Sequence, residues 1–264
     1  MIRLGVCGWP VAHSRSPRMQ NAALAHMGLA DWHYQALPLP PHLFTETVKA
    51  LPPLGFKGVN VTIPHKEQAL ALADEATETA KAIGAANTLT FNADGTIHAD
   101  NTDAPGFLAA LNRSAYDRTA LVLGAGGTAR AVLYALRQAG AKQIHLWNRS
   151  PARAQALADE FGATLGAAPA EIIVNTTSVG LRDPEETFKA LPLQADELGA
   201  GCTVVDMVYR HGGTLLLNTA RANGADVVDG LEILVAQGAA SLERWTGRTA
   251  PDKAMREAVA DIAQ

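Results

Sequence analysis

The hydrophobic residues of this chain gather in short apolar runs that alternate with stretches of helical periodicity. In the first hundred residues we expect strands at 2–7, 33–37, 58–63 and 88–91, and helices at 17–27, 42–51 and 75–83. A helix at 105–111 and a polar segment at 112–118 lead to a second series, with strands at 120–123, 143–147, 172–175 and 203–207 and helices at 128–139 and 151–161. The end of the chain is helical, at 231–245 and 252–262. Strands separated by helices predict βαβ units and a mainly parallel sheet.

A glycine-rich turn follows the first strand of the second series, at Gly124, Ala125, Gly126, Gly127 and Thr128. Gly124 allows a tight turn, and Gly126 lets backbone N–H groups approach a pyrophosphate. The N-terminus of the next helix then faces the phosphates with unpaired N–H groups and the positive end of its dipole. A glycine turn alone is a weak signal, and a bare loop is the alternative. The order of strand, turn and helix favours a dinucleotide site.

The end of the next strand distinguishes between the two nicotinamide dinucleotides. An NAD site carries Asp or Glu about 20 residues further on, where it binds the ribose 2′-hydroxyl. Here the strand ends in Asn148, Arg149 and Ser150, and Arg153 follows within the next turn of helix. Two guanidinium groups and a hydroxyl suit a 2′-phosphate, although a solvated helix start is the alternative. The sequence therefore predicts NADP(H).

A lysine and an aspartate each follow an apolar run in the first series. Lys66 lies just beyond Val61 and Ile63, behind Pro64, and Asp103 closes a short polar turn before a new helix. Held in this way, the two side chains can form a proton-transfer pair. A surface lysine in the first turn of a helix is the alternative for Lys66. A cation at a helix N-terminus is electrostatically unfavourable, which favours a role other than stability.

Other polar residues stand at positions where a ligand would explain them. Ser14 and Ser16 can converge on a carboxylate, although Ser16 could instead cap the helix that follows. Asn87 begins a strand and can bind a hydroxyl through its amide, and Gln237 needs a polar partner on an apolar helical stretch. His65 is set aside as a catalytic residue, because adjacent side chains point in different directions.

Composition narrows the classes of protein. With 48% hydrophobic and 18% charged residues and a net charge of -4, the chain is expected to be a packed globular protein without a nucleic-acid partner. The histidines lie on separate elements and predict no metal site. No apolar run approaches the ~20 residues that span a bilayer. Cys7 and Cys202 lie in apolar runs and are expected to be buried, reduced thiols. With no signal-peptide pattern at the start, we expect a cytoplasmic protein without a membrane partner.

These motifs together resemble the shikimate dehydrogenase family, from Gly8 to Gly247. The resemblance implies an α/β fold with an N-terminal substrate domain, a C-terminal Rossmann-type NADP-binding domain and a cleft between them. With the polar break near 103–118, we place the first domain at 1–103 and the second at 104–237. The helices of 238–264 are expected to pack back on the first domain.

The resemblance also implies an activity, the reversible NADPH-dependent reduction of 3-dehydroshikimate to shikimate in chorismate and aromatic amino acid biosynthesis. Lys66 and Asp103 would then be catalytic and contact the substrate. The other implied substrate-binding residues are Ser14, Ser16 and Tyr209 for the carboxylate and Thr62, Asn87 and Gln237 for ring hydroxyls. Met207 and Gly230 would lie near the nicotinamide.

The sequence is compatible with two alternative functions and does not determine the oligomeric state. One alternative is a quinate/shikimate dehydrogenase with relaxed substrate choice. Another is a non-catalytic NADP-sensing protein on the same fold, which would be expected to lack Lys66 or Asp103, although both are present. The sequence also leaves open whether the protein is a monomer or a homodimer.

Overall fold

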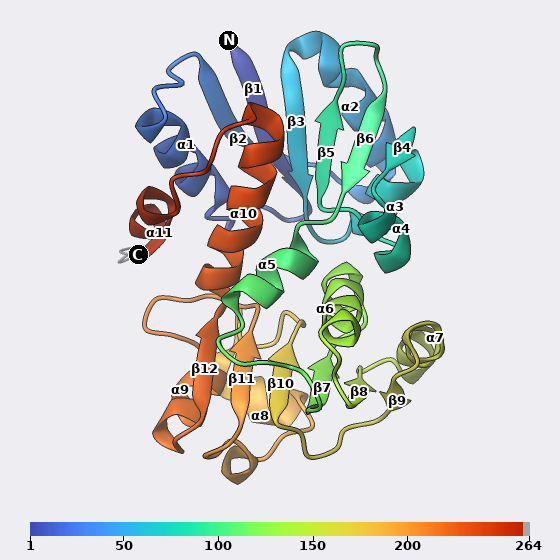
Figure 1. Ribbon diagram of the computed structural model, residues 1–264, viewed down its shortest axis with the longest axis vertical. Coiled ribbons are helices and arrows are strands. Elements are labelled where there is room, and N and C mark those ends of the chain that lie inside the picture. Colours follow the sequence, from blue (N-terminus) through green and yellow to red (C-terminus); the bar gives the residue numbers. More distant parts are fainter. Residues whose placement is uncertain (261–264) are drawn as a thin grey trace. The chain divides into compact units, whose positions relative to one another are not determined.

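The computed structural model describes residues 1–260, which form two compact units (Figure 1). Among the described residues, the first contains 1–106 and 234–260, and the second contains 107–233. The sequence predicts these limits at 103/104 and 237/238. The last residues of the predicted helix at 252–262 and of the segment at 238–264 lie outside the described residues.

A mixed six-stranded sheet forms the centre of the first unit. Its strand order is β2(Trp32–Pro38), β1(Ile2–Gly8), β3(Phe56–Val61), β5(Thr88–Phe91), β6(Ile97–Asp100) and β4(Glu75–Ala76). The strands β2, β1 and β3 are parallel, as the alternation with helices predicted. In contrast, β5 is antiparallel to β3 and to β6. A turn closed by the Asn92 N–H and the Thr96 carbonyl, 2.9 Å apart, joins β5 directly to β6, so no crossover helix is needed there.

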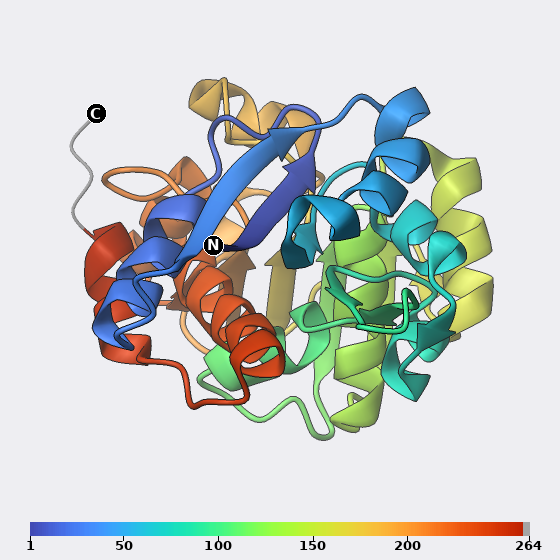
Figure 2. The same cartoon turned by 90° about the horizontal axis from the view of Figure 1, so that it is seen from above.

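Helices cover both faces of this sheet. They are α1(Ser16–His26), α2(Phe44–Ala50), α3(Lys66–Leu72), α4(Glu78–Ile83), α10(Gly230–Thr246) and α11(Asp252–Ala260), with short 3-10 turns at Pro41–Leu43 and Pro52–Leu54. Val59 and Val61 of β3 face a buried apolar cluster that includes Phe44 of α2. The alternate residue Asn60 points to the other face, where it meets α10. On the outside of the unit α11 lies beside α1 (Figure 2).

One predicted helix of the first unit is shorter than expected. The sequence predicts a helix over 75–83, but its first two residues form β4, in which Glu75 pairs with His98. Thr77 stops the helix from extending backward. Its backbone is extended and its hydroxyl accepts a hydrogen bond from the Ala80 N–H, so that it caps α4.

A fully parallel six-stranded sheet forms the centre of the second unit. Its order is β9(Thr164–Leu165), β8(Gln143–Trp147), β7(Thr119–Leu123), β10(Ile172–Asn175), β11(Thr203–Asp206) and β12(Asp226–Asp229). Counted from β7, this is the 3-2-1-4-5-6 order of a dinucleotide-binding fold, which confirms the predicted fold class. Its helices are α5(Asp103–Ala110), which spans the limit between the units, α6(Gly127–Gln138), α7(Pro151–Phe161), α8(Thr187–Ala190) and α9(Leu215–Ala222), with 3-10 turns at Pro184–Glu186 and Ala195–Glu197.

The apolar runs of the central strands explain the core of this unit. Leu121, Ile173 and Val204, from β7, β10 and β11, belong to one buried cluster with Leu216 and Leu217 of α9. Each such side chain contributes about 1.5–3 kcal/mol when it is fully buried. The cluster therefore holds the strand ends, and the loops that follow them, in place.

Both cysteines are buried free thiols, as predicted. Burial raises the pKa of Cys7 to about 12 and that of Cys202 to about 11. Within residues 1–260, none of the helices has both the length and the apolar character required to cross a membrane.

Candidate functional site

Several loops of the first unit meet at one edge of its sheet. Cys7 of β1 pairs with Val61 of β3, and the Trp9 N–H donates to the Ile63 carbonyl at 3.0 Å, so the loops after these parallel strands lie side by side. Because β5 is antiparallel to β3, it begins at the same edge, where the Asn87 carbonyl accepts from the Val61 N–H at 2.8 Å. Such an edge, at the carboxyl ends of parallel strands, is where α/β folds place their sites.

Lys66 is the first residue of α3 and is only 8% exposed. Its Nζ lies 2.6 Å from Oδ2 of Asp103. Its carbonyl accepts a hydrogen bond from the Ala86 N–H at 2.8 Å, which ties the start of α3 to the segment before β5. The alternative of a surface lysine is therefore wrong.

Asp103 is the first residue of α5 instead of the last residue of a turn. The side-chain oxygen of Asn101 accepts from the backbone N–H groups of Asp103 and Ala104, at 3.0 and 3.3 Å. A carboxylate in the first turn is favoured by the helix dipole. The hydrogen bonds at the helix start therefore fix the backbone of Asp103, and the ion pair with Lys66 fixes its side chain.

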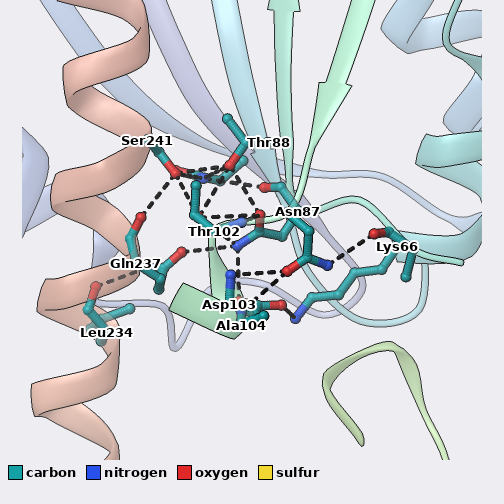
Figure 3. A network of polar contacts seen from close by, with 12 residues as sticks. Lys66, Asn87, Thr88, Thr102, Asp103, Ala104, Leu234, Gln237 and Ser241 are labelled. Carbon is teal, nitrogen blue, oxygen red and sulfur yellow. Dashed lines mark hydrogen bonds and ion pairs between the residues drawn. The ribbon is translucent and has the colours of Figure 1, made fainter. Parts of the chain in front are cut away.

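Asn87 joins this pair to α10 (Figure 3). Its Nδ2 donates to Oδ1 of Asp103 at 2.8 Å and to Oε1 of Gln237 at 3.2 Å. Gly106 brings α10 close, because a Cβ at this position would lie 2.8 Å from the Gln237 nitrogen. The polar partner that Gln237 was expected to need is therefore Asn87 within the protein itself.

The two serines lie at the start of α1. Ser16 is the first residue of this helix, and its N-cap is Arg15, whose side chain makes no cap hydrogen bond, so the alternative of Ser16 as the N-cap is wrong. Ser16 is buried, Ser14 is half-buried, and the Ser16 N–H donates to Oγ of Ser14 at 3.3 Å. Thr62, half-buried, follows β3 directly and donates its N–H to the Cys7 carbonyl at 2.9 Å.

His65 is occupied elsewhere. Its Nε2 lies 2.7 Å from the Leu39 carbonyl, and its ring stacks on Phe44 at 4.3 Å between centroids. Burial lowers the pKa of this imidazole, which favours the neutral form. The hydrogen bond and the ring stacking explain why a histidine is buried beside Lys66, and His65 is a packing residue.

The glycine turn of the second unit has the geometry that a dinucleotide requires. Gly124 has a φ of +114°, and a Cβ there would lie 2.5 Å from Oγ1 of Thr176, so only glycine fits. Gly126 is the N-cap of α6, and a Cβ at this residue would meet no atom within 4 Å. The backbone at the start of α6 is thus open to a phosphate, and the site fits the pyrophosphate of NADP(H).

The turn after β8 lies next to the glycine turn. The Gly124 N–H donates to the Trp147 carbonyl at 2.8 Å, and the Asn148 amide donates to the Ser150 carbonyl at 3.1 Å. Arg149, Ser150 and Arg153 are exposed. Their positive charge and the absence of an acidic residue at 148–150 fit a 2′-phosphate.

Asp206, which the sequence analysis did not single out, organises the neighbouring loops. Its Oδ1 accepts from the Asn175 amide at 2.9 Å and from the Val208 N–H at 3.0 Å, and its Oδ2 accepts from the Thr214 hydroxyl at 2.7 Å. Burial raises the pKa of this carboxyl to about 6. The loop that it anchors carries Met207 and Tyr209.

Gly230 lies against the same loop. A Cβ at Gly230 would be 2.7 Å from the Met207 carbonyl oxygen, so close backbone packing by itself accounts for a glycine here. Met207, Tyr209 and the glycine turn all belong to the second unit, whereas the serines, Thr62, Lys66, Asn87, Asp103 and Gln237 belong to the first.

Buried hydroxyl and amide groups that the sequence did not indicate as part of the site lie behind Asn87, namely Asn60, Thr88 and Ser241. A signal for Asn60 was available, because this amide interrupts the apolar run of Val59 and Val61. A buried amide in the middle of a strand requires polar partners.

Comparisons with known proteins agree over most of the chain. Residues 6–89 match the family model of the shikimate dehydrogenase substrate binding domain, residues 108–175 that of shikimate / quinate 5-dehydrogenase, and residues 230–260 that of the shikimate 5'-dehydrogenase C-terminal domain. The chain is 45% identical to the shikimate dehydrogenase (NADP(+)) of Paracoccus denitrificans over 97% of its own length and 94% of the relative's.

Solved structures show the same similarity. Shikimate 5-dehydrogenase of Thermus thermophilus, in complex with NADP(H) and shikimate, has a TM-score of 0.87 and 43% identity, with 98% of both chains covered. The ligand-free 5-ketofructose reductase of Gluconobacter sp. strain CHM43 has a TM-score of 0.85 and 31% identity, with 98% of both chains covered.

Proposed function

Since this chain belongs to the shikimate dehydrogenase family, we propose that it catalyses the reversible NADPH-dependent reduction of 3-dehydroshikimate to shikimate. It is an NADP-dependent oxidoreductase that acts on a CH–OH group, and the reaction is a step of aromatic amino acid biosynthesis. The observation that carries the proposal is the buried pair of Lys66 and Asp103, 2.6 Å apart, next to Asn87.

The pair supplies the proton of the reaction. When bound, NADPH supplies the hydride that reaches the carbonyl carbon of the substrate. Lys66 holds a proton on Nζ and gives it to the oxygen of that carbonyl, which becomes the hydroxyl of shikimate. In the oxidation direction Lys66 takes the proton back. Asp103 stabilises the charged lysine and, through its second oxygen, keeps the Asn87 amide in position.

Neighbouring polar groups bind the rest of the substrate. Ser14 and Ser16, with Tyr209, bind the carboxylate, and support for the serines is that both lie together at the start of α1. The ring hydroxyls are bound by Thr62, Asn87 and Gln237. Support for the two amides is their shared contact with each other and, for Asn87, with Asp103.

The second unit binds NADP(H). Gly124, Ala125, Gly126, Gly127 and Thr128 hold the pyrophosphate, and Asn148, Arg149, Ser150 and Arg153 hold the 2′-phosphate. Met207 and Gly230 lie beside the nicotinamide. The open backbone at the N-terminus of α6 and the exposed arginines support these roles. A cytoplasmic location is part of the proposal and is supported by the two reduced thiols.

The test measures NADP⁺ reduction with shikimate and with quinate, and NADPH oxidation with 5-ketofructose, each in a separate assay. We expect efficient turnover with shikimate and little with the other two. Comparable efficiency with quinate would identify a relaxed quinate/shikimate dehydrogenase. Binding of NADP(H) without turnover of any of the three compounds would identify a non-catalytic NADP-binding protein and refute the proposal.

A further inference from the structure

Ser241 is a fully buried hydroxyl that lies behind the polar groups facing the Lys66–Asp103 pair. It stands one helical turn beyond Gln237 on α10, and its Oγ donates to the Gln237 carbonyl at 3.0 Å. The same oxygen lies 2.8 Å from Oγ1 of Thr88 and 3.1 Å from Oγ1 of Thr102 (Figure 3). Ser241 therefore joins α10 to the starts of β5 and α5.

Two amides in this network have fixed orientations. Oδ1 of Asn87 accepts from the Thr102 backbone N–H at 2.7 Å, while its Nδ2 faces the Asp103 carboxylate. A backbone N–H only donates and a carboxylate only accepts, so the Asn87 amide cannot be reversed. Nδ2 of Asn60 donates to the Asn87 carbonyl at 3.2 Å, which orients that amide in the same way.

Ser241 accepts a hydrogen bond from one of these two amides. The Asn60 amide donates to Oγ of Ser241 at 2.9 Å, and its own Oδ1 accepts from the Tyr34 hydroxyl at 2.8 Å. Burial raises the pKa of Tyr34, so this hydroxyl keeps its proton. A single serine oxygen thus meets groups from β3, β5, α10 and the residue before α5, all within the first unit.

We propose that Ser241 is a positioning residue for substrate binding, acting through Thr102 and Thr88 on the Asn87 amide. Oγ1 of Thr102 lies 2.9 Å from Nδ2 of Asn87, and Oγ1 of Thr88 lies 3.0 Å from Oδ1 of Asn87. Without the Ser241 hydroxyl, both threonine hydroxyls lose a neighbour and rotate toward Asn87, where they compete with the substrate and with Asp103 for its amide. The inference rests on the proposed function, because Asn87 binds substrate there.

The test compares Ser241→Ala with Thr246→Val. Thr246 is a matched control on α10, because its hydroxyl also donates to the carbonyl four residues earlier, that of Leu242, at 2.8 Å. The loss of one hydrogen bond predicts that Ser241→Ala lowers kcat/KM for shikimate by about three- to tenfold. The KM for NADP⁺ is expected to stay unchanged, and Thr246→Val to match the parent in both quantities.

A double-mutant cycle separates positioning from general stability. In an Asn87→Ala background, Ser241→Ala is expected to change kcat/KM for shikimate by less than about twofold, because the group through which it acts is gone. An equal loss in both backgrounds would overturn the proposal, and so would a parent-like Ser241→Ala. A parent-like Asn87→Ala would overturn it as well, since Asn87 would then not bind substrate.

A measurement without turnover keeps this inference distinct from the proposed function. If the parent protein reduces no NADP⁺ with shikimate, the proposed function fails. The side-chain amide signals of Asn87 in a ¹⁵N NMR spectrum still report on positioning. We expect them to shift in Ser241→Ala and not in Thr246→Val. Unshifted signals in Ser241→Ala would overturn the positioning role itself.

Discussion

The two carboxylate oxygens of Asp103 accept hydrogen bonds from different residues. Oδ2 accepts from Nζ of Lys66 at 2.6 Å, and Oδ1 accepts from Nδ2 of Asn87 at 2.8 Å. Lys66 and Asp103 stand 37 positions apart in the chain, each as the first residue of a helix. The ion pair therefore holds the starts of α3 and α5 together. In the proposed reaction, Lys66 supplies the proton and Asn87 orients the substrate.

Removal of the lysine should abolish most of the turnover. A positioned proton-transfer group contributes about 10²–10⁴-fold, so Lys66→Ala is expected to lower kcat by that factor with little change in shikimate binding. Asp103→Asn should also lower kcat, and the double variant should lose less than the product of the two losses, because the residues act as a unit. Steady-state kinetics on protein shown to be folded by circular dichroism checks this.

Lys81→Ala is the matched control. Lys81 forms an ion pair with Glu78 on the surface of the same unit, and its side chain is 57% exposed. Exposed pairs contribute little, about 0–1 kcal/mol, so this variant should have parent-like kinetics. If folded Lys66→Ala turned over within about threefold of the parent, water or another group would be the proton donor.

The serine pair should affect shikimate and not NADP⁺. Hydrogen bonds to a charged group contribute about 1.5–3 kcal/mol, so Ser14→Ala with Ser16→Ala should weaken shikimate binding at least about tenfold. Calorimetry of each ligand separately measures the difference. Ser114→Ala is a suitable control, because its Oγ accepts from the Tyr116 N–H in the same pattern, at an exposed turn. Unchanged shikimate affinity in the double variant would show that these serines only shape the turn before α1 and do not bind the substrate.

Arg149 should carry much of the preference for NADP⁺. A lost bond to the 2′-phosphate predicts that Arg149→Ala weakens NADP⁺ binding by about one to two powers of ten and leaves NAD⁺ binding unchanged. Lys142→Ala is the control, because Lys142 is an exposed cation just before β8, whereas Arg149 follows β8. This variant should keep the preference for NADP⁺ over NAD⁺. Equal kcat/KM of the unmodified protein with both cofactors would refute the assignment.

Two glycines should respond in opposite ways. The new Cβ in Gly126→Ala would have no atom within 4 Å, so the only expected cost in stability is the weaker N-cap preference of alanine, less than about 1 kcal/mol. The same methyl group should weaken NADP⁺ binding, because it lies where the phosphates approach the helix N-terminus. Gly230→Ala would push a methyl group to 2.7 Å from the Met207 carbonyl and should destabilise the fold by about 1–3 kcal/mol. Urea unfolding and NADP⁺ titration of both variants separate the effects. A Gly126→Ala protein with parent-like NADP⁺ affinity would contradict the phosphate role.

Much of the site was predictable because strand ends share an edge of the sheet. The runs before Lys66 and around the glycine turn have a clear apolar period, and they are strands in the structure. The parallel order of a dinucleotide-binding sheet then places Gly124 next to the turn at Asn148. These are consequences of local pattern and of a few topological rules.

The remaining features depend on contacts that local pattern does not encode. Asn60 and Ser241 meet across 181 positions of sequence, because α10 packs on the face of the sheet opposite to Phe44. The two-residue strand at Glu75 is too short to have a period, and its pairing with β6 outweighs the helical propensity of this segment. Asp206 lies at the end of an apolar run, and its role becomes visible only with its partners Asn175 and Thr214.

Asp206 should also make stability depend on pH. The pKa of this carboxyl is raised from 3.8 to about 6 by burial, with a smaller contribution from the charge of Asp229. Between these values the folded protein keeps a proton that the unfolded chain has lost. The stabilisation from Asp206 is therefore complete below pH 3.8 and is lost as the pH rises through about 6. At about 1.4 kcal/mol per pKa unit, the loss amounts to roughly 3 kcal/mol.

Asp206→Asn removes this titration and keeps the shape of the side chain. Relative to the parent, its free energy of unfolding should rise by up to about 3 kcal/mol between pH 4 and pH 7, as measured by urea unfolding. Asp94→Asn is the control. Hydrogen bonds from Thr96 lower the pKa of this exposed carboxyl, so its difference from the parent should change much less over this window than that of Asp206→Asn, and in the opposite direction. If Asp206→Asn kept a constant difference, the buried carboxylate would be ionised at both pH values, and its hydrogen bonds from Asn175, Val208 and Thr214 would outweigh the cost of burial.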